Sequence, residues 1–241
     1  MSKNVFNISN ELMSNAYPGR GIIFGRTLDN KQNVVAYFIM GRSENSRNRV
    51  FVETEDGICT QAYDPSKMTD PSLIIYHPVR QCEGKLVVTN GDQTDTICEY
   101  LREGKSYIDA LRTRQFEPDA PNYTSRISGV INEDGSYSLS ILKNFTSDRT
   151  SNKRFFYEYD KPVPGLGHFI HTYQCDGDPL PPFRGEPKCI RIEKPIKQFT
   201  EMLWTSMNEQ NKVALFVRYI DLATGAYWQE IRNKHEEGKN A

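Results

Sequence analysis

A dense group of arginines follows a strongly apolar segment near the start of this 241-residue chain. Residues 36–40 are apolar and end at Gly41, and Arg42, Arg47 and Arg49 fall within the next eight residues, separated by serines and asparagines. Five consecutive apolar residues are typical of a buried strand, and the following Gly-Arg-Ser step is typical of a strand that runs into a loop. Guanidinium, hydroxyl and amide groups at a sheet edge bind phosphates and carboxylates. We therefore interpret this segment as an anion-binding loop; the alternative is a solvated basic loop between two strands.

The distribution of charge along the chain agrees with a small anionic ligand. The formal net charge is only -1, so no global positive field attracts nucleic acid or an acidic membrane surface. Residues 1–50 nevertheless carry seven lysines and arginines against three acidic residues. The sequence contains no charged-then-apolar leader and no apolar run of membrane-spanning length, so we expect a cytoplasmic protein.

Three further positions carry residue types suited to proton transfer or anion binding. Residues 90–96, NGDQTDT, place a strand end next to a helix N-terminus, where free amides and the helix dipole favour an anion. Ordinary capping by Asp92 and Thr94 is the alternative. Glu117 lies at a helix C-terminus, where the dipole opposes a negative charge; it is either a functional acid with a raised pKa or a solvated surface residue. Tyr76 can relay a proton or simply pack in the core.

Metal and nucleophile chemistry finds little support in the sequence. The five cysteines are odd in number and widely spaced, without a CxxC pair, and we expect reduced, mostly structural thiols. His168 and His171 would lie on opposite faces of a strand, which makes them poor joint ligands for a metal. The common hydrolase, P-loop, zinc-protease and Rossmann motifs do not occur. Ser2 could act as an N-terminal nucleophile after removal of Met1, although ordinary start-site processing explains it better.

Hydrophobic periodicity and turn signals predict the elements that position these groups. Strands are expected at residues 21–27, 34–41, 50–53, 58–63, 73–79, 86–89, 127–132, 136–142, 155–159, 212–221 and 226–231. Helices are expected from residue 92 or 94 to 104, from 106 to 116 and from 196 to 207, with a short helix before Tyr17. Residues 160–188 predict a long irregular loop around a strand at 168–175. We infer one α+β domain over residues 1–241, with two mainly antiparallel sheets packed face to face and helices outside.

Several short motifs between residues 15 and 130 form a joint pattern. They are YPGR (17–20), GRT (25–27), AY (36–37), Arg42 and Ser43 with Asn48 and Arg49, Tyr76 in DPSLIIYHP, NGDQTDT (90–96), Glu117 and NYTSR (122–126). In order and spacing this pattern resembles the archaeal-type IMP cyclohydrolases. The resemblance implies a four-layer αββα fold like that of the N-terminal-nucleophile hydrolases, without self-processing. It also implies ring closure of 5-formamidoimidazole-4-carboxamide ribonucleotide to IMP with loss of water. His77 and the longer segment from 43 to 48 depart from the family pattern.

The same resemblance implies that Arg49, Tyr76 and Glu117 are catalytic. We expect Arg49 to hold the formyl oxygen, Tyr76 to donate a proton as water leaves, and Glu117 to accept the carboxamide proton. The substrate-binding residues that it implies are Arg20, Arg26, Tyr37, Arg42, Ser43, Asn48, Asn90, Gly91, Asp92, Thr94, Asp95, Asn122, Thr124 and Arg126. This chemistry requires no metal and no cofactor. The expected partner is a small imidazole or purine ribonucleotide, with no nucleic acid and no membrane, and a homo-oligomer stays open.

Two other functions remain compatible with these residues. An amide hydrolase on the same sandwich would cleave a C–N bond with a nucleophile at the mature N-terminus. A non-catalytic purine-nucleotide-binding protein would keep the pocket and lack turnover. The joint presence of Arg49, Tyr76 and Glu117 favours the cyclohydrolase over the binding protein.

Overall fold

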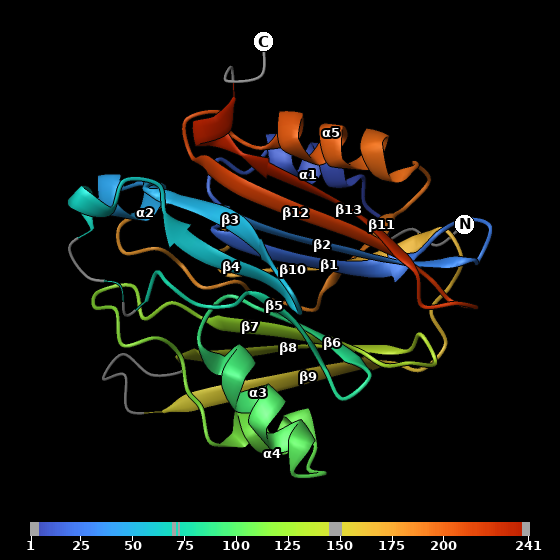
Figure 1. Ribbon diagram of the computed structural model, residues 1–241. Helices are drawn as coiled ribbons and strands as arrows, with labels where there is room; N and C mark the ends of the chain where they lie inside the picture. Colours follow the sequence, from blue (N-terminus) through green and yellow to red (C-terminus); the bar gives the residue numbers. More distant parts are fainter. Residues whose placement is uncertain (1–4, 69–70, 72, 145–150, 238–241) are drawn as a thin grey trace.

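The computed structural model describes residues 5–68, 71, 73–144 and 151–237, and Ser2 lies outside this part of the chain. The described residues form two antiparallel sheets packed face to face (Figure 1). The first sheet has six strands in the order β11 (Lys188–Arg191), β10 (Leu166–His171), β1 (Arg20–Arg26), β2 (Gln32–Met40), β12 (Lys212–Asp221) and β13 (Tyr227–Asn233). The second has seven strands in chain order: β3 (Arg49–Thr54), β4 (Gly57–Ala62), β5 (Val79–Cys82), β6 (Lys85–Thr89), β7 (Arg126–Ile131), β8 (Tyr137–Asn144) and β9 (Asn152–Tyr159).

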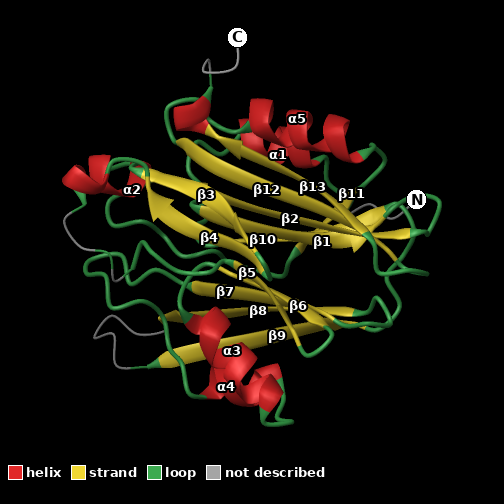
Figure 2. Cartoon of the chain, viewed as in Figure 1, coloured by secondary structure: helices red, strands yellow, loops and turns green. Residues whose placement is uncertain are grey.

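Helices cover the outer surfaces of both sheets (Figure 2). The α-helices of the described residues are α1 (Ile8–Met13), α2 (Glu44–Arg47), α3 (Gln93–Arg102), α4 (Tyr107–Arg112) and α5 (Ile196–Ser206). Two single 3-10 turns, η1 (Pro65–Lys67) and η2 (Lys234–Glu236), complete the described helical segments. Helices α1 and α5 pack on the six-stranded sheet, and α3 and α4 pack on the seven-stranded sheet. The layers therefore follow the order helix, sheet, sheet, helix.

Strand β2 shows how the sequence separates these layers. Its even-numbered side chains pack with α1 and α5, and its odd-numbered side chains pack against the second sheet. The first set is Val34, Ala36, Phe38 and Met40, and the second set is Val35, Tyr37 and Ile39. Every side chain from Val34 to Met40 has 0% exposure, so both faces of the strand are buried. This explains why the segment is a continuous apolar run without alternation.

Most predicted elements are confirmed. The hairpins β1–β2, β7–β8 and β12–β13 form as expected, and helices α3 and α5 lie where the periodicity places them. Helix α4 ends at Arg112, four residues before the predicted end, so Glu117 lies in the following loop and not at a helix C-terminus as predicted. The predicted strand at residues 73–79 is wrong, since only Val79 belongs to β5. The N–H groups of Ile74 and Ile75 both donate to the backbone oxygen of Pro71 in a turn, so they are not available to a sheet. Strand β11 falls at the end of the segment that was expected to be irregular.

The expectation of reduced cysteines is wrong for one pair. Cys82 at the end of β5 and Cys98 on the buried face of α3 form a disulfide, with Cα atoms 5.6 Å apart. Cys59, Cys175 and Cys189 are free thiols. The spacing of 16 residues does not reveal this pair, because the two cysteines meet only when α3 packs back onto β5. Among the described helices, none is both long and apolar enough to cross a membrane.

Candidate active site

One end of the space between the two sheets collects the central site residues. Arg20 is the first residue of β1 and Arg49 is the first residue of β3. Arg20 lies two residues before Ile22 and Arg49 lies two residues before Phe51, and both apolar residues belong to the core between the sheets, as does Tyr37. The two-residue period of a strand therefore directs Arg20, Tyr37 and Arg49 into this space from both sides.

Arg49 is fully buried, and its guanidinium group is only partly hydrogen-bonded. Nε donates to the backbone oxygen of Ser46 at 2.8 Å, whereas Nη1 and Nη2 have no partner. Helix α2 presents this oxygen, because Ser43 and Ser46 close a capping box at its N-terminus. Burial, and then the neighbouring Arg20 guanidinium, lower the pKa of Arg49. A buried cation with two free nitrogens is costly unless a ligand completes its bonds, so we interpret Nη1 and Nη2 as a binding site for an electronegative atom.

Tyr76 reaches the same cluster from the loop before β5. Its hydroxyl lies 2.8 Å from the hydroxyl of Tyr37, and both side chains are buried. Thr60 fixes this loop, because its N–H donates to the backbone oxygen of Tyr76 at 2.9 Å and its Oγ1 accepts from the N–H of Tyr76 at 2.9 Å. Burial, and then the facing Tyr76, raise the pKa of Tyr37 well above its usual value. Tyr37 therefore stays a phenol, which can share a proton with Tyr76.

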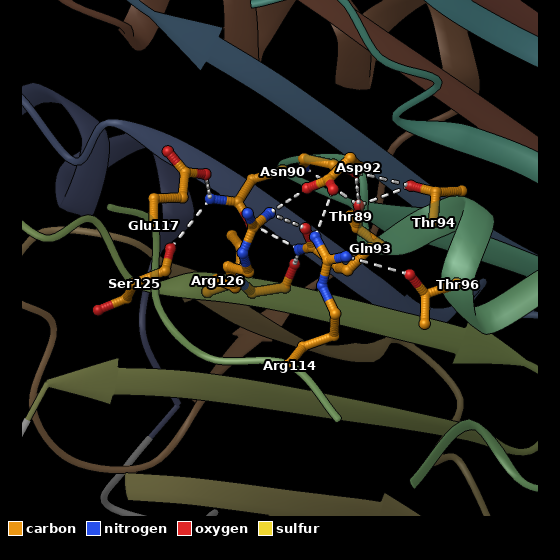
Figure 3. A network of polar contacts seen from close by, with 12 residues as sticks. Thr89, Asn90, Asp92, Gln93, Thr94, Thr96, Arg114, Glu117, Ser125 and Arg126 are labelled. Carbon is orange, nitrogen blue, oxygen red and sulfur yellow. Dashed lines mark hydrogen bonds and ion pairs between the residues drawn. The ribbon is translucent and has the colours of Figure 1, made fainter. Parts of the chain in front are cut away.

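Glu117 supplies the acid of the cluster. Its side chain is 3% exposed, and Nδ2 of Asn90 donates to its Oε1 at 3.4 Å (Figure 3). Burial raises the pKa of Glu117 to about 7, although the guanidinium groups of Arg20, Arg126 and Arg49 act in the opposite direction. A carboxyl group with a pKa near neutrality can accept a proton from a bound ligand and release it again.

A hydrogen-bond network at the N-terminus of α3 supports Glu117 (Figure 3). Oδ1 of Asn90 accepts from the N–H of Ile127 at 2.8 Å and from Nε2 of Gln93 at 3.0 Å. Oε1 of Gln93 in turn accepts from Nη1 of Arg126 at 2.6 Å. A Cβ at position 91 would lie 2.5 Å from Nη1 of Arg126 and 2.8 Å from Oε1 of Gln93, so a larger residue there would displace these two groups. Gly91 and its neighbours thus position the acid and an arginine.

The remaining predicted residues contact other parts of the protein. Asp92 makes no capping hydrogen bond, and its carboxylate pairs with Arg114 and Arg126. Ser43 caps α2. The other contacts are Asn48 with Asp64, Thr94 with Thr89, Asp95 with Arg80, Asn122 with Leu180, Thr124 with Asp119 and Tyr173, and Arg42 with Asp176. Each of these side chains thus has a protein partner, and its part in substrate binding stays a prediction.

Two phenols that the sequence did not assign complete the cluster. The rings of Tyr17 and Tyr173 stack with their centroids 5.8 Å apart. Burial alone would lower the pKa of Arg20, but Tyr173, Tyr17 and Glu117 raise it well above its usual value. Tyr17 belongs to the YPGR motif, which could have revealed it. Tyr173 lies in the strand expected at residues 168–175, but β10 ends at His171, and nothing in the sequence signals that Tyr173 meets Tyr17.

Arg26 is the predicted site residue that the structure does not bring to this end. It is the last residue of β1, so six residues of strand, about 20 Å, separate it from Arg20. Its Nη2 donates to the backbone oxygen of Gly135 at 3.0 Å, and its Nη1 donates to Oδ1 of Asn30 at 3.4 Å. Proximity in the sequence is misleading here, because an extended strand carries its two ends to opposite edges of the molecule.

An Arg26→Met variant is therefore expected to keep its activity and lose stability. We expect kcat/KM within about threefold of the parent, and a free energy of unfolding lower by about 1–3 kcal/mol because charged hydrogen bonds are lost. Steady-state kinetics and urea unfolding measure the two effects. A loss of activity by a hundredfold or more in a folded variant would place Arg26 in the site after all.

The two histidines of β10 do not form a metal site. His168 and His171 face opposite sides of the sheet, as predicted, and their Nδ1 atoms bond to the hydroxyl of Tyr137 and the backbone oxygen of Tyr173 at 2.8 and 2.7 Å. Burial lowers the pKa of His168 to about 4 and that of His171 to about 3, so both are neutral at pH 7. Within the described ranges, no group of three or more His, Cys, Asp and Glu side chains could hold a metal ion.

Two cavities of similar volume lie at the two ends of the molecule. One of about 490 Å³ opens beside Glu117 and is lined in part by Phe116, Pro118 and Arg126. The other, of about 470 Å³, lies at the opposite end, where Asn33 and Arg218 contribute to its wall, and the predicted site residues do not line it. We therefore associate the first cavity with the site.

The fold and the site together define a two-sheet α+β protein with a buried cluster of arginines, tyrosines and one glutamate at one end of its sheets. A sequence model of the family described as IMP cyclohydrolase-like protein matches residues 17–225. The chain belongs to this family.

Curated relatives agree with this assignment at modest identity. The protein named IMP cyclohydrolase from Methanococcus aeolicus is 28% identical over 166 residues, which cover 66% of this chain and 75% of the relative. The protein of the same name from Methanopyrus kandleri is 27% identical, over 65% of this chain and 75% of the relative. The one from Methanosphaera stadtmanae is 30% identical, over 66% of this chain and 74% of the relative.

Proposed function

We propose that this protein is an IMP cyclohydrolase, which closes 5-formamidoimidazole-4-carboxamide ribonucleotide to IMP with loss of water in purine biosynthesis. Membership of the family and the names of the curated relatives support this function. The observation that carries the chemistry is the buried Arg49 guanidinium, whose Nη1 and Nη2 have no partner, in the same cluster as a glutamate with a pKa of about 7. These are the groups needed to hold a carbonyl oxygen and to move a proton.

The substrate itself supplies part of the catalysis. Its carboxamide nitrogen and formyl carbon are substituents of one imidazole ring, so the reacting atoms are already close together. The protein must select the rotamer in which they meet, stabilise the developing oxyanion and transfer protons. In our assignment Arg49, assisted by the positive charge of Arg20, binds the formyl oxygen.

Each proton then has a donor and an acceptor. The carboxamide nitrogen attacks the formyl carbon and gives one proton to Glu117. The oxygen, held by Arg49, takes a proton from Tyr76 and leaves as water with the proton that Glu117 accepted. The former formamide nitrogen gives its proton to the Tyr76 phenolate as the C=N bond forms. Tyr37, hydrogen-bonded to Tyr76 at 2.8 Å, can relay this proton. One water is released and the enzyme returns to its starting state.

Several broader features belong to the same proposal. We propose a single domain over residues 1–241 and a relation to the N-terminal-nucleophile hydrolases, supported by the order helix, sheet, sheet, helix. We also propose a cytoplasmic enzyme that acts without nucleic acid or membrane partners and that can form a homo-oligomer. In the reverse direction the reaction hydrolyses the C–N bond of a cyclic amidine, so the enzyme is classed as a cyclohydrolase.

A direct assay tests the proposed function. Purified protein mixed with the formamido ribonucleotide should produce the ultraviolet absorbance of a purine, and chromatography should identify the product as IMP. An Arg49→Ala variant of the same fold is the control for contaminating enzymes. Binding of the nucleotide without product formation would instead support a purine-nucleotide-binding protein.

A further inference from the structure

A pocket lined by three arginines lies next to the catalytic acid. Its volume is about 490 Å³, and its lining residues are Thr113, Arg114, Gln115, Phe116, Pro118, Arg126 and Arg154. Phe116 and Pro118 are the chain neighbours of Glu117, so the pocket adjoins the site directly. We propose that this pocket binds the phosphate group of the substrate nucleotide, with Arg114 and Arg154 as binding residues. The proposal rests on the function proposed above.

The charge of the pocket matches that of a phosphate monoester. One carboxylate, Asp92, lies between two of the arginines: its Oδ1 is 2.7 Å from Nη1 of Arg126, and its Oδ2 pairs with Nη2 of Arg114 (Figure 3). Three guanidinium groups and this one carboxylate leave a net charge of +2. A phosphate monoester carries about -1.5 to -2 at pH 7.

The arginines are held in place and still have hydrogen atoms to donate. The side chain of Arg126 is 6% exposed and its Nε has no partner. Arg154 donates through Nε and Nη2 to the backbone oxygens of Leu111, Arg112 and Arg114, which uses three of its five N–H groups. Arg114 donates to Asp92 and to Oγ1 of Thr96. Such a preorganised set of forked donors binds a tetrahedral anion at little entropic cost.

The other arginines that the sequence assigns to the site do not line this pocket. Arg20 and Arg49 point into the space between the sheets, where the reacting atoms are expected. Arg42 donates to Oδ1 of Asp176 at 2.7 Å and to the backbone oxygen of Gly177 at 2.8 Å. Arg26 lies at the far end of β1. The pocket beside Glu117 therefore remains as the cationic surface for the far end of the nucleotide.

The test compares the nucleotide with the nucleoside that lacks its phosphate. In Arg154→Gln and in Arg114→Gln we expect KM for the nucleotide to rise about tenfold or more, because charge-assisted hydrogen bonds are lost, with kcat within about threefold. KM for the nucleoside should change less than about twofold. Arg154→Lys keeps the positive charge but loses the forked pair of donors, so its KM for the nucleotide should lie between those of the parent and of Arg154→Gln. Arg112→Gln is the matched control, since Arg112 is exposed and pairs with Asp109 at 2.9 Å.

Titration of each variant with ribose 5-phosphate by calorimetry separates this proposal from the proposed function. Weaker binding in Arg154→Gln and Arg114→Gln, with unchanged binding in Arg112→Gln, supports the pocket whether or not the protein cyclises its substrate. An equal rise in KM for the nucleotide and for the nucleoside would overturn the proposal. Unchanged affinity for ribose 5-phosphate in Arg154→Gln or Arg114→Gln, in a variant with a normal melting temperature, would also overturn it.

Discussion

Replacement of Arg49 by methionine is expected to abolish cyclisation and to raise the stability of the protein. The guanidinium of Arg49 is fully buried with Nη1 and Nη2 unpaired, and its positive charge lies close to that of Arg20. Removal of a buried, incompletely paired charge stabilises a fold by about 1–4 kcal/mol when an apolar side chain fills the space. Loss of the donors to the developing oxyanion should reduce kcat/KM by about 1,000-fold or more. Urea unfolding and steady-state kinetics measure the two effects.

Arg218→Met is the matched control for this prediction. Arg218 is also a buried arginine on a strand facing the other sheet, but Nε and Nη2 donate to Oε1 of Gln229 at 3.1 and 2.6 Å. Its guanidinium also lies 4.0 Å from the ring centroid of Tyr227. We expect this variant to lose stability and to keep its activity. A stability loss in Arg49→Met as large as that in Arg218→Met would show that Arg49 is a structural residue.

Glu117→Gln is expected to lower kcat by a factor of about 100 to 10,000, the usual contribution of a general base. Burial raises the pKa of Glu117 to about 7, and the reaction requires the ionised form. The parent rate should therefore rise as the pH increases through 7 and level off above it. The variant should lack this rise, because glutamine does not titrate. Glu103→Gln, at an exposed position paired with Lys105, should retain the full pH profile. An unchanged rate in Glu117→Gln would remove this acid from the mechanism.

The same carboxyl group makes stability depend on pH in a defined direction. Its pKa is about 7 in the folded protein against the usual value of 4.5 in an unfolded chain, so between these values only the folded state holds the proton. The contribution of Glu117 to stability is therefore complete below pH 4.5 and falls as the pH rises through 7, by about 3 kcal/mol. Relative to the parent, Glu117→Gln should gain stability between pH 5 and pH 8. A constant difference in unfolding free energy between variant and parent over this range would mean that Glu117 has an ordinary pKa.

Local sequence signals predicted most of the fold. The turn residues between apolar runs placed the hairpins of β1 with β2 and of β12 with β13, and the 3.6-residue period placed α5. These elements depend on neighbouring residues, which the sequence displays. The disulfide between Cys82 and Cys98 could not be predicted, since it depends on how α3 packs on β5.

The sequence predicts only those site residues that belong to recognisable motifs. The positions of Arg49 and Glu117 came from their similarity to a family, and the structure adds why each is buried and what faces it. The loop that carries Tyr76 was mistaken for a strand, because its conformation is set by Thr60, a residue 16 positions earlier. Tyr173 was missed for a similar reason, since it meets Tyr17 only through the packing of the folded chain.

The central claim is that Arg49, Tyr76 and Glu117 act on one bound imidazole nucleotide. A crystal structure of the protein with IMP tests it most directly. We predict that C2 of the purine, the former formyl carbon, lies within about 3.5 Å of the Arg49 guanidinium or the Tyr76 hydroxyl, with N1 towards Glu117 and the phosphate between Arg114 and Arg154. IMP bound in the cavity beside Asn33 and Arg218, without contact to Arg49, Tyr76 or Glu117, would contradict the account.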